Sequence, residues 1–180
     1  TMLLLINRGC NLKCSFCDLW QDFENMPLQK TLPLLDQAVK IGTQTVVITG
    51  GEPFIYPELW TVVRAAKDRG LSVNITTNGT LIDKHWDALC SSGVDSLSFS
   101  IDGMPTTHDI IRGQKGAWKR TVAGLEGWNH GEQVMQRHWT FSTGPDSGNP
   151  SWLSSRRQDD CGERRPVTQF YAALAIICFA

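Results

Sequence analysis

Hydrophobic and polar positions along the first 130 residues predict strands and helices in strict alternation. Continuous apolar or β-branched runs predict strands over residues 2–6, 45–49, 71–77 and 95–101. Apolar residues at helical spacing predict helices over residues 32–41, 59–67, 83–90 and 116–129, with Gly42 ending the first and Asp83 capping the third. We therefore expect four βα units.

Alternating strands and helices predict an α/β fold with parallel strands joined by right-handed crossovers. We expect the first strand, an unbroken apolar run, to be buried on both faces. Each strand is followed by a polar or glycine-rich segment: residues 7–10, 50–53, 78–79 and 100–103. The carboxyl ends of parallel strands share one edge of the sheet, so these segments are expected to lie together and to carry the chemistry.

The periodic pattern fails after residue 131. Residues 141–160 are rich in Ser, Gly, Pro, Arg and Trp, and only residues 138–142 suggest a short strand. All seven lysines precede residue 120, whereas six of the ten arginines lie at 120 or beyond. We expect a core domain over 1–130 and an irregular tail over 131–180 that is either disordered or out of frame, as translation of the other two reading frames would decide.

Composition narrows the function classes. A length of 180 residues with 41% hydrophobic and 19% charged side chains indicates one globular domain with a core. The net charge of −1 predicts neither a nucleic-acid nor a membrane-surface partner, and no apolar run approaches the roughly 20 residues that span a bilayer. Three of the six cysteines lie within eight residues and no signal peptide precedes them, which favours a reducing, cytoplasmic setting over disulfides.

Those three cysteines, Cys10, Cys14 and Cys17, form a CxxxCxxC motif directly after the first strand. Thiolates bind iron–sulfur clusters and zinc, but structural zinc needs four closed ligands and no second CxxC follows. Three thiolates on a four-iron cluster leave one iron free to bind another molecule. The spacing favours such a catalytic cluster, with zinc or unliganded thiols as the alternatives.

A second motif, Gly50-Gly51-Glu52-Pro53, follows the second strand. Two glycines allow a close backbone approach to a ligand, and Glu52 can accept a hydrogen bond from a ligand ammonium. The alternative is an ordinary glycine turn with a solvated glutamate.

The two motifs together, with Phe16 before the third cysteine, resemble the radical S-adenosylmethionine (SAM) superfamily. The resemblance implies a partial (β/α) barrel, of whose six units four are recognisable here. It also implies that Cys10, Cys14 and Cys17 hold a 4Fe-4S cluster whose fourth iron is chelated by SAM. Gly50, Gly51, Glu52 and Pro53 would then hold the amino group of the cofactor's methionine moiety.

Polar residues at the third and fourth strand ends extend the resemblance. Family members place ribose-contacting groups where this chain has Ser100 and Asp102, and Asn78 lies at the corresponding end of the third strand. The alternative for all three is an ordinary turn, at Asn78-Gly79 and Asp102-Gly103.

Residues 100–113 are similar to a segment of members, many with a SPASM domain, that modify peptides or build cofactors. Within it, His108, Asp109 and Arg112 either brace the loop over the site, with Asp109 and Arg112 paired one helical turn apart, or form a surface ion pair.

The resemblance implies a radical enzyme that reductively cleaves SAM to a 5′-deoxyadenosyl radical, which abstracts hydrogen from a peptide, a protein or a cofactor precursor. Its electron donor would be a flavodoxin or ferredoxin. The alternative is a truncated, inactive domain that binds an iron–sulfur cluster or zinc, because the fifth and sixth units are not recognisable. No catalytic acid or base can be assigned from the sequence.

Overall fold

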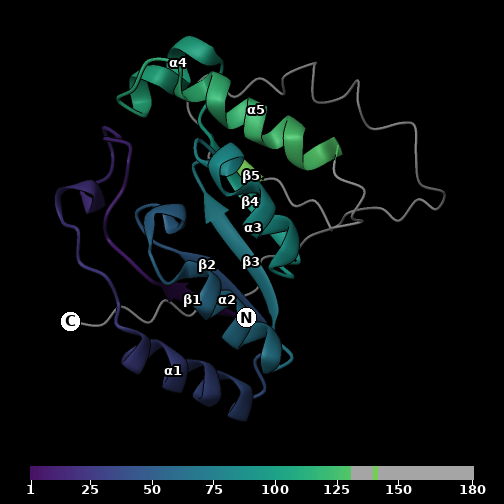
Figure 1. Cartoon of the computed structure of the whole chain (residues 1–180). Coiled ribbons are helices and arrows are strands. Elements are labelled where there is room, and N and C mark those ends of the chain that lie inside the picture. Colours follow the sequence, from purple (N-terminus) through teal and green to yellow (C-terminus); the bar gives the residue numbers. More distant parts are fainter. Residues whose placement is uncertain (131–139, 142–180) are drawn as a thin grey trace.

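A computed structural model describes residues 1–130 and 140–141 of the chain (Figure 1). Its five parallel strands form one sheet in sequence order: β1 (Met2–Leu5), β2 (Thr45–Thr49), β3 (Ser72–Thr77), β4 (Ser96–Ile101) and β5 (Thr140–Phe141). The sequential order of parallel strands is that of an opened β/α barrel. The α/β class, the four strands and their direction are confirmed.

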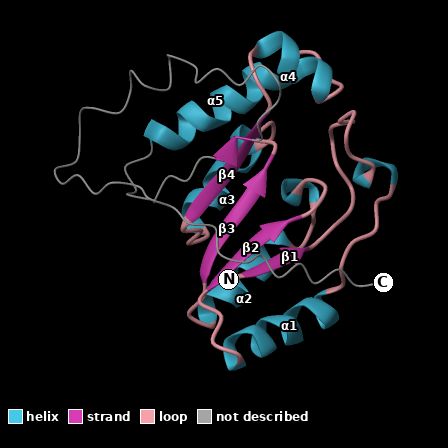
Figure 2. Cartoon of the chain, turned by 180° about the vertical axis from the view of Figure 1, so that it is seen from behind, coloured by secondary structure: helices cyan, strands magenta, loops and turns pink. Residues whose placement is uncertain are grey.

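Five α-helices accompany the strands: α1 (Leu28–Lys40), α2 (Leu59–Asp68), α3 (Trp86–Ser91), α4 (Pro105–Ile111) and α5 (Ala117–His130). Three 3₁₀ turns lie between them: η1 (Leu19–Gln21), η2 (Pro53–Ile55) and η3 (Ile82–His85). In the view from behind, the strands lie in front of α2 and α3 (Figure 2). Within the part of the chain that the structure describes, no helix is long and apolar enough to cross a membrane.

The two faces of the sheet differ in chemistry. Residues paired in register across the strands, such as Ile48, Ile75 and Leu97, are fully buried in the hydrophobic core. The opposite face carries polar side chains, including Asn74, whose amide donates to the Ser96 hydroxyl at 2.7 Å. Apolar burial therefore fixes one face against the helices, and the polar face is left to form the inner wall of the partial barrel.

Several boundaries differ from the sequence predictions. Helix α1 begins one turn before residue 32, and Pro33 lies inside it. Asp83 does not cap α3: it lies in the 3₁₀ turn η3, and the residue before α3 is His85. Helix α4 was not predicted, because its seven residues are too few to show a helical period.

The two edges of the sheet give one correction and one agreement. Leu5 is 40% exposed, so β1 is not buried on both faces; among the described strands it pairs with β2 alone and is an edge strand. Thr140 and Phe141 pair with Ser100 and Ile101 as a short parallel strand, which agrees with the short strand suggested over residues 138–142. The predicted boundary at residue 130 and the predicted character of the tail otherwise lie outside the described residues.

Candidate functional site

A cavity of about 170 Å³ opens at the carboxyl ends of the strands. It is lined by the three motif cysteines, by residues from the ends of β2, β3 and β4, and by α4: Cys10, Leu12, Cys14, Phe16, Cys17, Trp20, Thr49, Gly50, Gly51, Thr76, Thr77, Asn78, Ser100 and Arg112. The polar segments that follow the strands thus meet in space as the sequence pattern predicts. Of the predicted site residues, Glu52, Pro53 and Asp102 do not line this cavity.

The cysteine-bearing loop is fixed by the end of α4. The backbone N–H of Ser15 donates to the carbonyl of Ile111 at 2.9 Å, and that of Lys13 donates to the carbonyl of Arg112 at 3.3 Å. Gly113 follows with a φ of +66°, and a Cβ there would lie 2.4 Å from the Lys13 carbonyl oxygen. Glycine is therefore required where the two segments touch.

Two of the three sulfurs receive hydrogen bonds from the protein. The Cys10 sulfur accepts from the Leu12 backbone N–H at 3.4 Å and from the Asn78 amide at 3.9 Å. The Cys14 sulfur accepts from the Arg112 guanidinium at 3.7 Å. Burial raises the pKa of both thiols, and the nearby Arg112 opposes this effect at Cys14.

The thiols fit a multi-iron cluster better than a single ion. A closed structural zinc site takes four protein ligands, and this cavity is lined by three cysteines and no His, Asp or Glu. A four-iron cluster instead binds each thiolate to a different iron, so three cysteines spread around one cavity suit it. Its positive irons would also favour the thiolate forms that burial disfavours.

Glu52 is fully buried and bonded to the protein itself. Its carboxylate accepts from the Thr77 hydroxyl at 2.8 Å, from the Asn78 backbone N–H at 2.8 Å and from the Phe54 backbone N–H at 3.2 Å. Burial raises the pKa of Glu52 to about 7, and these three donors oppose that shift. The solvated-glutamate alternative is wrong, and the role of Glu52 toward a ligand ammonium stays a prediction.

The two glycines of this motif pack against the loop after β1. A Cβ on Gly51 would lie 2.1 Å from the Gly9 carbonyl oxygen, and one on Gly50 would lie 2.1 Å from the side-chain oxygen of Asn7. The buried Asn7 amide donates to the carbonyls of Gly9 (3.1 Å) and Glu52 (3.0 Å). The glycines therefore dock the cysteine loop on the end of β2. The sequence places Asn7 in the polar segment after the first strand, but it does not reveal this role.

Asp102 forms an ion pair with Arg112, which the sequence did not predict. Both of its carboxylate oxygens are engaged by Arg112: Oδ2 accepts from Nε in a very short bond and Oδ1 from Nη2 at 3.0 Å. Its ribose contact stays a prediction. Asp109 is not the partner of Arg112; it accepts from the backbone N–H of Trp118 at 2.8 Å and from that of Gly116.

Asn78 and Ser100 both line the cavity, and their predicted cofactor contacts stay predictions. The Asn78 amide donates to Asn11 at 2.9 Å, and its oxygen accepts from the Thr80 hydroxyl at 2.6 Å. Because these contacts fix the side chain, Asn78 orients Asn11 and Cys10. Pro53 is buried at the start of η2.

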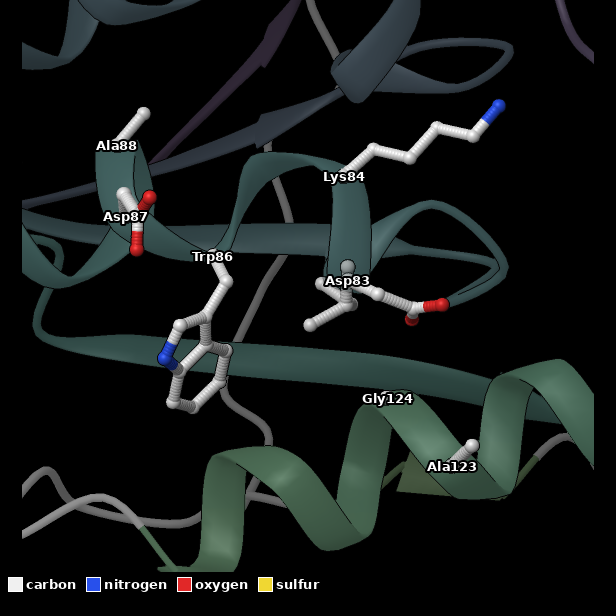
Figure 3. Close-up of a pocket in the computed structure, with 8 residues that line it drawn as sticks. Asp83, Lys84, Trp86, Asp87, Ala88, Ala123 and Gly124 are labelled. Carbon is white, nitrogen blue, oxygen red and sulfur yellow. The ribbon is translucent and has the colours of Figure 1, made fainter.

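A larger cavity of about 590 Å³ lies between η3, α3 and α5, lined by Asp83, Trp86, Gly124 and five other residues (Figure 3). It contains no cysteine and none of the predicted site residues. We place the candidate site in the smaller cavity because the metal-binding thiols lie there.

Comparison with known proteins shows the family of the chain. The sequence profile of the Radical SAM superfamily matches residues 4–129. The chain belongs to the radical SAM superfamily. Its members are enzymes that use a 4Fe-4S cluster and S-adenosylmethionine. The match extends from β1 into α5 and includes every residue of the candidate site.

Two curated relatives illustrate the range of reactions in the family. The chain is 36% identical over 144 residues to an AdoMet-dependent heme synthase of Methanosarcina barkeri, covering 76% of this chain and 41% of that protein. It is 31% identical over 133 residues to a PqqA peptide cyclase of Rhizobium meliloti, covering 71% of this chain and 35% of that protein. The chain thus spans well under half of either relative.

Solved structures share the fold. SuiB of Streptococcus suis, bound to its precursor peptide SuiA, superposes with a TM-score of 0.65 at 23% identity, covering 77% of this chain and 31% of that chain. SuiB bound to S-adenosylmethionine gives a TM-score of 0.63 at 23% identity, with the same coverage of both chains. These likenesses support the partial-barrel architecture.

Proposed function

We propose that this chain is the cluster-binding part of a radical enzyme that acts on a peptide, a protein or a cofactor precursor. The observation that carries the proposal is the cavity at the strand ends, where three thiols face residues from β2, β3 and β4. The bound cluster would supply one electron to SAM, which breaks the S–C5′ bond and gives methionine and a 5′-deoxyadenosyl radical that takes a hydrogen atom from the substrate. A flavodoxin or ferredoxin would provide the electron.

The chain's own residues would bind and orient these groups. Cys10, Cys14 and Cys17 would ligate the cluster through their sulfurs. Gly50 and Gly51, both partly buried, line the cavity, where the methionine end of SAM would bind beside the buried Glu52. Ser100, at the end of β4, would hydrogen-bond the ribose. Phe16 and Trp20 also line the cavity and would limit access of water to it.

The substrate class rests on relatives of two kinds. The heme synthase and the PqqA peptide cyclase are named for a cofactor product and a peptide substrate, respectively, and both exceed 30% identity to this chain. Deuterium transfer distinguishes a cofactor precursor from a peptide substrate. Each candidate is deuterated at the reacting carbon, and only a true substrate places deuterium in the 5′-deoxyadenosine product.

Anaerobic reconstitution with iron and sulfide tests the proposal. We expect about four irons per chain, and loss of this iron when Cys10, Cys14 and Cys17 are all replaced by Ala. The matched control is Cys90→Ala, because Cys90 lies on α3 away from the cavity and should leave the iron content unchanged. Tight binding of one zinc and no iron would contradict the proposal.

The second candidate is an inactive cluster-binding domain, because the fifth and sixth βα units of the family's barrel are not recognisable in the sequence. The two candidates differ in product formation. With dithionite and SAM, the enzyme would form 5′-deoxyadenosine, whereas the inactive domain would hold a full cluster and form none.

A further inference from the structure

The pair Asp102–Arg112 connects the end of β4 to the cysteine loop, and no catalytic role assigned above uses it. Both side chains are almost completely buried, with 6% and 7% of the residue surface exposed. Arg112 donates two hydrogen bonds to the Asp102 carboxylate, and its remaining nitrogen, Nη1, lies 3.7 Å from the Cys14 sulfur. One guanidinium therefore joins a carboxylate on one side to a cluster ligand on the other.

Two further contacts fix the orientation of this guanidinium. The Phe16 ring lies 5.6 Å from the Arg112 guanidinium carbon. The second contact holds the carboxylate partner in place: the backbone N–H of Asp102 donates to Nδ1 of the fully buried His108 at 3.2 Å. Arg112 thus has few alternative orientations, and its contact with Cys14 is built into the fold.

We propose that the Asp102–Arg112 pair sets the reduction potential of the cluster bound by Cys10, Cys14 and Cys17. Arg112 is the positioning residue that brings a positive charge to Cys14, and Asp102 partly offsets this charge. The proposal rests on the proposed function, because it needs the cluster to bind.

The physical reason is the charge that reduction adds. An electron entering the cluster makes it more negative, so a nearby cation and an N–H···S bond stabilise the reduced form and raise the potential. A guanidinium keeps its proton at every working pH, and its field is poorly screened at a buried site. The Asp102 carboxylate acts in the opposite direction. Removing the charge of Arg112 should therefore lower the potential, and removing the charge of Asp102 should raise it.

The test is an anaerobic redox titration of the reconstituted full chain without SAM, followed by electron paramagnetic resonance of the reduced cluster. Arg112→Gln should lower the midpoint potential, with at least a tenfold loss in the equilibrium constant for reduction, about 59 mV for one electron. Asp102→Asn should raise the potential. The matched control is Arg69→Gln, which removes the arginine of an exposed pair with Asp36 at the other end of the sheet and should leave the potential unchanged.

A purely structural role for the pair predicts a different result. Both single variants would then lose iron or shift in the same direction, and either outcome overturns the inference. If Arg112→Gln fails to fold because the Asp102 carboxylate has lost its Arg112 partner, the double variant Asp102→Asn/Arg112→Gln is compared with Asp102→Asn, since these two differ only at Arg112. The double variant should have the lower potential. A full cluster with unchanged potential overturns this inference alone, whereas a wild-type chain without iron overturns the proposed function as well.

Discussion

The carboxylate of Glu52 accepts a 2.8 Å hydrogen bond from the backbone N–H of Asn78, so that a buried acidic side chain ties the end of β2 to the end of β3. Thr77 and Phe54 provide two more donors to the same carboxylate. Burying an ionised carboxylate costs free energy that hydrogen bonds only partly return. The ionisation state of Glu52 should therefore affect the stability of the whole site.

We predict that ionisation of Glu52 lowers the free energy of unfolding of the cluster-free protein as the pH rises from about 5 to 8. Burial raises the pKa of Glu52 from 4.5 to about 7, so the unfolded chain loses this proton first and is favoured as pH increases. The full effect is about 3 kcal/mol. Denaturant titrations across this range should show a flatter pH dependence for Glu52→Gln, which cannot ionise.

His108 provides an internal check on that experiment. Burial and the nearby Arg112 lower its pKa from 6.5, so the unfolded state binds this proton more readily and stability rises with pH up to about 6.5. Burial lowers the pKa of His85 in the same direction, so these two histidines oppose Glu52 mainly below pH 6.5. Among these three groups, Glu52 dominates between about 6.5 and 7.5. Equal slopes for the wild type and Glu52→Gln in that upper interval would contradict the assignment.

Gly51→Ala should destabilise the protein by roughly 2–3 kcal/mol, because the new Cβ would meet the backbone oxygens of Gly9 and Arg8 at 2.1 and 2.3 Å. Backbone atoms cannot move aside as a flexible side chain can. The control is Gly42→Ala, where φ is +80° but nothing lies within 4 Å, so only backbone strain of about 1 kcal/mol is expected. Thermal unfolding of both variants gives the comparison; equal losses would show that the loop contact is unimportant.

Much of this fold could be predicted from local sequence. The strand positions follow from β-branched and apolar runs, and the shared edge of their polar ends follows from parallel topology. Short elements and long-range pairs could not be found in this way. Helix α4 is too short to show a period, and Pro33 concealed the first turn of α1.

The ion pairs show most clearly that local sequence does not reveal long-range contacts. Asp109 and Arg112 have the spacing of one helical turn, but Arg112 pairs with Asp102, ten residues away. Tertiary packing places that partner, since α4 folds back over the end of β4. The cysteine motif could be recognised because its three ligands are close together in the sequence. The side chains that donate to the sulfurs, Asn78 and Arg112, follow β3 and α4 and are distant in the sequence.

The actual role of Asp109 gives a prediction of its own. Its carboxylate accepts from the backbone N–H groups of Gly116 and Trp118 at the start of α5, as a helix cap does. Asp109→Ala should cost about 1 kcal/mol and speed hydrogen exchange at these two amides. Lys13 and Ser15, whose N–H groups bond to the end of α4, serve as the control amides and should keep their protection. Faster exchange at those amides alone would support the brace predicted from the sequence.

Ser100 is a direct test of the predicted cofactor contacts, because it lines the cavity beside the three cysteines. Ser100→Ala in the reconstituted protein should weaken SAM binding about fivefold to tenfold, as expected for one hydrogen bond of about 1 kcal/mol. Calorimetric titration measures this directly. The matched control is Ser98→Ala on the same strand, whose hydroxyl donates to Asn74 at 3.2 Å and does not line the cavity. If the two variants bind SAM equally well, Ser100 does not contact the ribose.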